Sequence, residues 1–151
     1  MRYWNLTYND PDRWREVYAI SGPPLGFVAG IRASLSGRST GSPKAELVDA
    51  SCENLRDLLQ LTSNLKWANA QRTQQGIVLY FRVLLETYGL PMRRGEVNLG
   101  PLQPAGDSAM LLTLTAQRHS DSQEWIQLQG PAERMQSLRA WLSDALGVQS
   151  V

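Results

Sequence analysis

The pattern of apolar and polar positions is clearest in the last third of the chain. Ala109–Arg118 and Glu124–Gln129 alternate between apolar and other side chains with a period of two, which is typical of strands with one buried face. The polar residues 118–123 between them predict a hairpin loop. Pro131–Leu146 carries apolar residues at helical spacing, and Gly147 is a typical helix end. We therefore expect a β-hairpin followed by a helix that packs back on it.

The first third of the chain predicts a strand, a helix and a second strand. Arg2–Tyr8 is rich in aromatic and β-branched residues, which favours a short strand. Asp10 and Pro11 are typical of the cap and the first position of a helix, and we expect that helix to end at Gly22. The period-two alternation across Phe27–Leu35 predicts a half-buried strand, and a flexible Gly/Ser connection follows it.

The middle of the chain is predicted to be mainly helical. Pro43 is expected to open a helix whose apolar residues recur at helical spacing, at Val48, Cys52, Leu55 and Leu59. Residues 76–89 fit two patterns, because their β-branched and aromatic content favours a buried strand while four apolar residues share one helical face. Since Gly89, Leu90 and Pro91 resemble a helix end, we predict a helix there. A short edge strand is expected at Glu96–Leu99.

These elements predict a single α+β domain across residues 1–151. We expect an antiparallel sheet of about four or five strands, with about three or four helices packed mainly on one face. A chain of this length can bury roughly 70% of the surface that its unfolded form exposes, so it can hold a core without disulfides. The apolar fraction of 42% and the charged fraction of 19% are ordinary for a globular protein.

Composition narrows the function mainly by exclusion. A net charge of +1, with basic residues spread along the chain, argues against a dedicated nucleic-acid binder. The single cysteine, Cys52, allows neither an intrachain disulfide nor a cysteine-based zinc site, and we expect no metal and no cofactor. The N-terminus lacks a signal-peptide pattern, and no apolar stretch is long enough to span a bilayer. The expected location is therefore the cytoplasm.

Isolated reactive side chains give little support for catalysis. His119 is the only histidine, and it lies in the predicted hairpin loop near Asp121, where we expect a solvated side chain rather than a general base. Cys52 belongs to an apolar stripe and has acidic neighbours, which favours a buried thiol over a reactive thiolate. Neither GxGxxG nor the P-loop pattern occurs, so the Gly-rich residues 37–41 are interpreted as a linker.

The aromatic residues of the N-terminal segment are the strongest functional signal. They are interleaved with arginines, and such residues can anchor a protein interface, stack on bases or line a pocket. They can equally form a second core layer around a short helix, which is the simplest explanation. Arg93 and Arg94 follow a predicted helix end and can bind an anionic partner, although a solvated pair is the default.

We therefore predict a non-enzymatic protein-interaction or assembly module, of an adaptor, chaperone-like or immunity type. The expected partner is another protein or a second copy of the chain, a small molecule is a further option, and nucleic acid ranks last. The alternative is a small-ligand-binding protein or an enzyme of unrecognised type, with its site near residues 22–42 and 93–94. The candidate partner-binding residues are Trp4, Tyr8, Trp14, Tyr18, Arg93 and Arg94.

Overall fold

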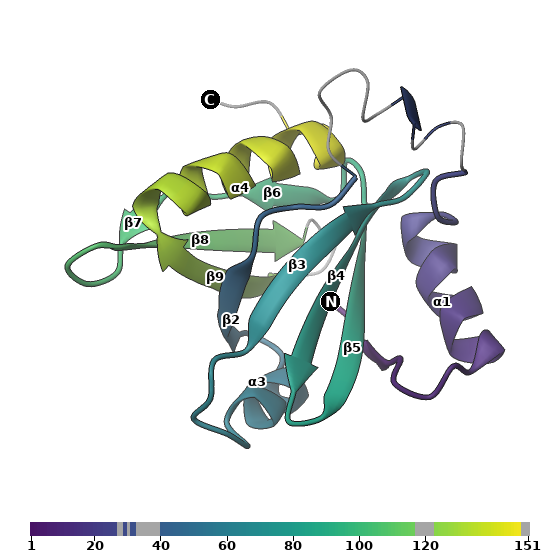
Figure 1. Ribbon diagram of the computed structural model, residues 1–151, viewed down its shortest axis with the longest axis horizontal. Helices are drawn as coiled ribbons and strands as arrows, with labels where there is room; N and C mark the ends of the chain where they lie inside the picture. Colours follow the sequence, from purple (N-terminus) through teal and green to yellow (C-terminus); the bar gives the residue numbers. More distant parts are fainter. Residues whose placement is uncertain (27–28, 30, 33–39, 117–122, 149–151) are drawn as a thin grey trace.

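The computed structural model describes residues 1–26, 29, 31–32, 40–116 and 123–148 (Figure 1). Within them, nine strands form one antiparallel sheet, and three helices with defined bounds pack against it. The helices are α1 (Pro11–Ser21), α3 (Glu53–Leu59) and α4 (Ala132–Leu146). The strands are β1 (Trp4–Asn5), β2 (Ala45–Ala50), β3 (Trp67–Arg72), β4 (Gly76–Val83), β5 (Glu86–Arg93), β6 (Val97–Leu99), β7 (Gln103–Pro104), β8 (Ala109–Ala116) and β9 (Glu124–Pro131).

The predicted α+β fold class is wrong. Among the described residues, 41% lie in strands and 27% in helices, so the protein is predominantly β, and its sheet is not closed. The strand order is β1-β5-β4-β3-β2-β9-β8-β6, with β7 paired to β8 off this path. β2 joins the two halves of the sheet, because it pairs with β3 on one side and with β9 on the other. The four or five strands expected from the sequence are thus fewer than the structure contains.

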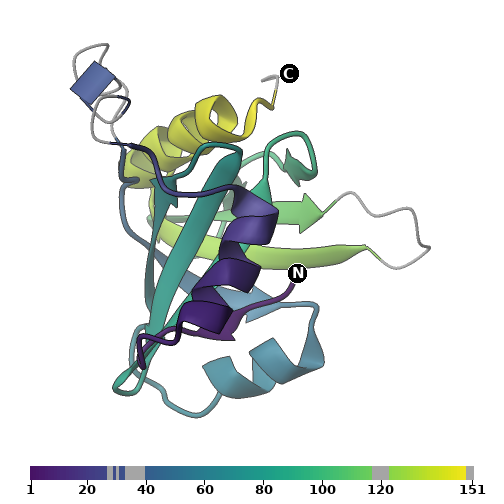
Figure 2. The same cartoon turned by 90° about the vertical axis from the view of Figure 1, so that its right-hand side faces the viewer.

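The expected placement of the helices mainly on one face is also wrong. The main core contains the buried side of α4 together with Ile77 and Leu79 of β4. A second, smaller core contains Val17 of α1 together with Val78 of β4. Because successive strand residues point to opposite faces, α1 and α4 cover opposite sides of β4. Figure 2 shows α1 lying along the β4–β5 side of the sheet, away from α4.

Burial on both faces explains why residues 76–89 were predicted as a helix. Val78 and Leu79 point to different cores, yet both are fully buried, so β4 has no apolar–polar alternation. The large side chains of residues 76–89 happen to recur at helical spacing, which favours a helix prediction. In the structure these residues instead form most of the β4–β5 hairpin. Gly89 and Pro91 do not end a helix. They lie in β5, whose outer neighbour β1 pairs only with Tyr88 and Gly89. Pro91 therefore lies past the end of β1, where its missing backbone N–H costs no ladder hydrogen bond with that strand.

The helix predicted from Pro43 is wrong in its first half. Ala45 and Leu47 are buried and alternate with half-buried neighbours in β2, which is the pattern of a strand. The helical part begins only after Cys52, where α3 buries Leu55 and Leu59. Cys52 itself is half-buried and packs against the main core.

The elements at the two ends of the chain are confirmed. α1 begins after Asp10, whose carboxylate accepts a hydrogen bond from the Asp12 backbone N–H at 2.9 Å, and it ends at Gly22 with φ 77°. The short strands β1 and β6 lie within their predicted ranges. β8 and β9 form the predicted hairpin, and α4 packs on it. The inward-facing residues are buried, namely Leu112, Leu114, Ile126, Leu128, Met135, Leu138, Trp141, Leu142 and Ala145.

Two predicted features fall mainly on residues that the structure does not describe. His119 and Asp121 lie outside the described residues. Of the strand predicted at 27–35, only Ala29, Ile31 and Arg32 are described, and these three have a helical conformation. Across the described parts of the chain, no helix is long and apolar enough to cross a membrane.

Candidate interaction surface

Three of the predicted binding aromatics lie between α1 and the sheet. Trp4 is only 9% exposed, and its indole Nε1–H donates to Glu16 Oε2 at 2.5 Å. The Trp14 ring lies 5.3 Å from that of Tyr18 and 6.3 Å from that of Tyr80, centroid to centroid. These rings belong to or pack against the second core. They hold α1 in place, and a partner-binding role for them stays a prediction.

Burial keeps the phenols of this cluster neutral. It raises the pKa of Tyr18 above the usual value of 10.0. Burial, assisted by the neighbouring Tyr18, raises the pKa of Tyr80 to about 12. A phenol with the usual pKa is already protonated near neutral pH, and the raised pKa extends that range upward. These residues therefore provide packing surface and hydrogen-bonding groups rather than a base.

Arg93 binds two backbone carbonyls near the C-terminal end of one helix, and Arg94 binds one near the C-terminal end of another. Arg93 donates from Nε to the Ile20 carbonyl at 3.0 Å and from Nη2 to the Ala19 carbonyl at 3.1 Å, at the end of α1. Arg94 Nε donates to the Ala145 carbonyl at 3.3 Å, near the end of α4. A cation at this position satisfies carbonyls of the last turn and interacts favourably with the helix dipole. The two arginines thus fix the ends of two helices against the sheet.

The hollow beside Arg93 is small. It has a volume of about 80 Å³ and is also lined by Arg2, Met92 and Glu96. Small-molecule sites usually measure roughly 300–1,000 Å³, so this hollow does not favour the alternative of a ligand site at Arg93. Much of the range 22–42, the other half of that alternative, lies outside the described residues. Among the residues that are described, no group of three His, Cys, Asp or Glu side chains could hold a metal ion.

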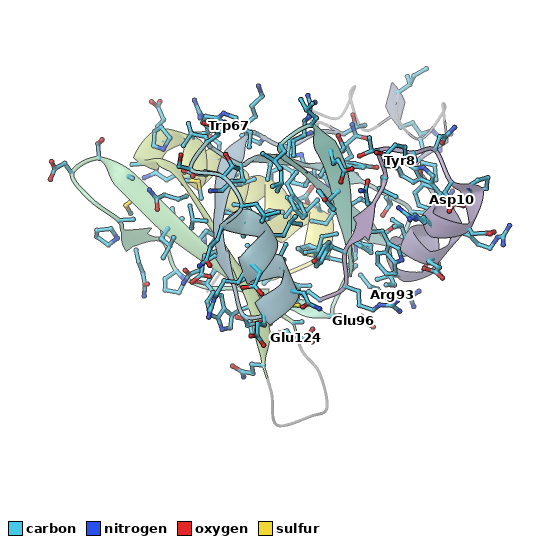
Figure 3. The ribbon with its side chains drawn as sticks, turned by 90° about the horizontal axis from the view of Figure 1, so that it is seen from below. Tyr8, Asp10, Trp67, Arg93, Glu96 and Glu124 are labelled. Carbon is cyan, nitrogen blue, oxygen red and sulfur yellow. The ribbon has the colours of Figure 1, made fainter. Side chains whose placement is uncertain are left out.

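Tyr8 is the one predicted aromatic that is largely exposed, at 66%. Its hydroxyl donates to Glu86 Oε1 at 3.2 Å, and Glu86 follows the turn between β4 and β5. The other oxygen of Glu86 accepts from Asn5 Nδ2 at 2.7 Å and from the Tyr88 hydroxyl at 3.0 Å. In Figure 3, which looks at the molecule from below, Trp67 lies at the upper left, Tyr8 lies at the upper right near Asp10, and Arg93 lies below Tyr8.

Four exposed apolar side chains belong to the β4–β5 turn and to residues 65–67, at the start of β3. In Figure 1 the ribbons of both segments lie at the lower end of the molecule. We call Leu65, Trp67, Leu84 and Leu85 the tip patch. Leu84 is 62% exposed and Leu85 is 84% exposed. Most other large apolar side chains described in the structure are covered, so a concentration of exposed ones is typical of an interaction site.

Three residues of the tip patch, Leu65, Trp67 and Leu84, line a hollow of about 340 Å³. Ala68 and Phe81 pair across β3 and β4 and are both buried in the main core. Their neighbours Trp67 and Arg82 therefore project from the outer face, side by side. The guanidinium carbon of Arg134 lies 6.0 Å from the Trp67 ring centroid. The hollow is lined by Thr62, Asn64, Leu65, Trp67, Arg82 and Leu84.

Leu84 has an unusual backbone conformation for its residue type. It is the only non-glycine residue with positive φ in the described chain, at 57°. Leu84 and Leu85 form a two-residue turn, because Val83 pairs with Glu86. A turn with positive φ at its first position normally has glycine there, and a leucine costs about 1 kcal/mol. This turn therefore combines backbone strain with two exposed apolar side chains, and neither feature stabilises the fold.

The sequence carried no usable signal for this surface. Neither Leu84 nor Leu85 is a residue type that favours turns. A helix across residues 76–89, as the sequence predicts, would also contain no turn at these two positions. The segment containing Leu65 and Trp67 is mixed in polarity and gave no boundary. Only Tyr8 connects the predicted residues with the tip patch, through its hydrogen bond to Glu86.

Comparison with protein-family models, with curated proteins and with solved structures gives no match to this chain. Two features of the molecule stand out beside its packed cores: the concentration of exposed apolar side chains at the tip patch and the strained turn at Leu84.

Proposed function

We propose that the protein is a non-enzymatic interaction module, such as an adaptor or assembly factor, that binds a protein partner through the tip patch. The observation that carries the proposal is the exposed Leu84–Leu85 turn beside Leu65 and Trp67. Removing such apolar surface from water contributes roughly 25 cal/mol per Å², which makes the patch a favourable place for contact. The exposed Tyr8 bonds to Glu86, the residue that follows Leu85, and provides a separate amphipathic ring beside this turn.

The strain at Leu84 supports the same proposal. A glycine at position 84 would remove the strain, and a polar residue at position 85 would remove exposed apolar surface. The chain has leucine at both positions, although neither contributes to the core. Strained and exposed residues of this kind often occur where a binding partner needs them.

Affinity capture from the source cell tests the proposal. The bait proteins are the tagged full chain, the variant Leu84→Gly/Leu85→Ser, and Ile31→Ser as a matched control. Ile31 is also a large exposed apolar residue, at 44%, but it belongs to neither segment of the tip patch. We expect the wild type and the control to retain the same partner and the double variant to lose it. Equal retention by all three proteins, with the double variant folded, would contradict the proposal.

A further inference from the structure

We infer that the tip patch binds an acidic segment of its partner, with an apolar side chain in the hollow and carboxylates on Arg82 and Lys66. The inference rests on the proposed function and adds the chemistry of the partner. It follows from the shape of the hollow and from the charges around it. The same charges would repel those of a second copy of the chain at this surface.

The hollow is suited to one apolar side chain and its flanking backbone. Leu65, Trp67 and Leu84 line it, so an inserted side chain meets apolar surface. Thr62 and Asn64 add polar groups to the lining, with which the backbone of a bound peptide can form hydrogen bonds. A volume of about 340 Å³ lies in the usual range for bound groups, roughly 300–1,000 Å³.

The cations around the hollow are not neutralised. Within the described chain, Arg82 makes no hydrogen bond or ion pair, although it lines the hollow. Lys66 forms only a long bond to the Thr62 carbonyl, at 3.4 Å, and Arg134 lies near the Trp67 ring. Such cations beside apolar surface favour a partner of opposite charge, because complementary potentials speed association and select the partner.

The nearby acidic residues do not cancel this charge. Glu86 lies on the opposite face of the hairpin from Arg82, because Arg82 pairs with Thr87 and the side chains of a strand alternate. Both oxygens of Glu86 are already bonded. Glu46 pairs with Trp67 across β2 and β3 and therefore lies beside it on the outer face. Among the described residues that line the hollow, Arg82 is charged and none is acidic.

The same charges disfavour a second copy of the chain as the occupant. A symmetric dimer through this surface would place Arg82 and Lys66 of one copy against those of the other. Nucleic acid is also a poor fit, because the patch is mainly aliphatic and its single aromatic ring, Trp67, already has Arg134 near its face. An acidic segment with an apolar anchor satisfies both the apolar surface and the cations.

A peptide array provides the test, with the full chain as the labelled probe. The first set contains short acidic peptides with a central Leu, Ile, Phe or Trp. A second set has Gln in place of every acidic residue, and a third has Ser in place of the central residue. We expect binding to the first set alone, in a manner that weakens as salt is raised. Solution affinities of the best binders are then measured by fluorescence anisotropy.

Three variants locate the interaction. Arg82→Glu should weaken the binding of acidic peptides about tenfold or more, because it replaces an attraction by a repulsion. Leu84→Gly/Leu85→Ser should weaken it as well, because it removes apolar contact. Arg15→Glu is the control, since it makes the same change of charge at an exposed position on α1, and it should leave the affinity unchanged.

Several outcomes would overturn the inference. The first is that the Gln peptides bind as well as the acidic ones, and the second is that no peptide set binds. The third is binding to phosphatidylserine vesicles without peptide binding. The fourth is a wild-type dimer in sedimentation that is lost in Leu84→Gly/Leu85→Ser. The proposed function fails separately, when the Leu84 variant captures the same partner as the wild type. If capture depends on Leu84 but the acidic peptides do not bind, the interaction module stands and only the acidic partner is rejected.

Discussion

Trp4 donates its indole N–H to the Glu16 carboxylate at 2.5 Å, and this bond ties the N-terminal strand to α1. Trp4 is nearly covered, and it packs with Leu6, Val17 and Val78 in the second core. The aromatic N-terminal segment therefore covers one face of the β4–β5 hairpin. This relationship gives a direct test of whether Trp4 is needed for stability.

Replacing Trp4 by Ala should lower the free energy of unfolding by about 3–5 kcal/mol, because it removes a large buried ring and leaves a cavity. Glu16→Ala should cost less, about 1 kcal/mol, because the carboxylate is exposed and only the hydrogen bond is lost. Urea denaturation followed by circular dichroism measures both. A Trp4→Ala variant that is as stable as the wild type but fails to bind a partner would show instead that Trp4 belongs to the interface.

The turn at Leu84 should reverse the usual ranking of alanine and glycine. At ordinary positions Gly is less stabilising than Ala, because it makes the unfolded chain more flexible. At φ 57° the alanine variant retains the strained Cβ, whereas the glycine variant does not. We expect Leu84→Gly to be more stable than Leu84→Ala by about 1 kcal/mol in urea unfolding. Equal stabilities, or a more stable alanine variant, would show that the turn is not strained.

Gly76 lies against the backbone of β5 with no room for a side chain. A Cβ at this position would lie 1.9 Å from the backbone carbonyl oxygen of Met92, and a backbone atom cannot move aside as a flexible side chain can. Gly76→Ala should therefore destabilise the protein by about 3 kcal/mol or more in thermal or urea unfolding. Gly41→Ala is the control, because nothing lies within 4 Å of its added Cβ. Similar losses in the two variants would contradict this packing.

The elements predicted correctly from the sequence each have one buried face. In α1, α4 and the β8–β9 hairpin, apolar residues recur at the spacing of a helix or a strand, and caps such as Asp10 and Gly147 mark the ends. β4 differs because it is buried on both faces, so Val78 and Leu79 give no alternation. A pattern that records only polarity cannot separate such a strand from a buried helix.

The candidate surface was harder to predict for a related reason. Residue type shows that Trp14 and Tyr18 are large and favour burial, but it does not show which surface covers them. The structure places them on the side of α1 that packs against the second core, and it leaves Tyr8 exposed. The exposure of Leu84 and Leu85 depends on the register of the β4–β5 hairpin, a tertiary feature that the polarity pattern does not contain.

Two tyrosines couple the stability of the fold to alkaline pH. Burial, assisted by the neighbouring Tyr18, raises the pKa of Tyr80 to about 12. For Tyr88, burial acts first, and the hydrogen bond of its hydroxyl to Glu86 and the charge of that carboxylate add to it, so its pKa also rises to about 12. The Tyr88 ring is stacked on Phe81 across the β4–β5 pair, at 5.4 Å between centroids, which explains its burial.

The folded state thus favours the neutral phenols, whereas in the unfolded chain they ionise near the usual pKa of 10.0. The stabilisation is complete below pH 10 and is lost as the pH rises toward 12, because the unfolded state then releases these protons first. Urea unfolding at successive alkaline pH values should show this loss, and absorbance of the tyrosinate ion should follow the titration. Tyr80→Phe/Tyr88→Phe should reduce the pH dependence relative to the wild type. An equal decline in both proteins would show that other groups cause the alkaline loss.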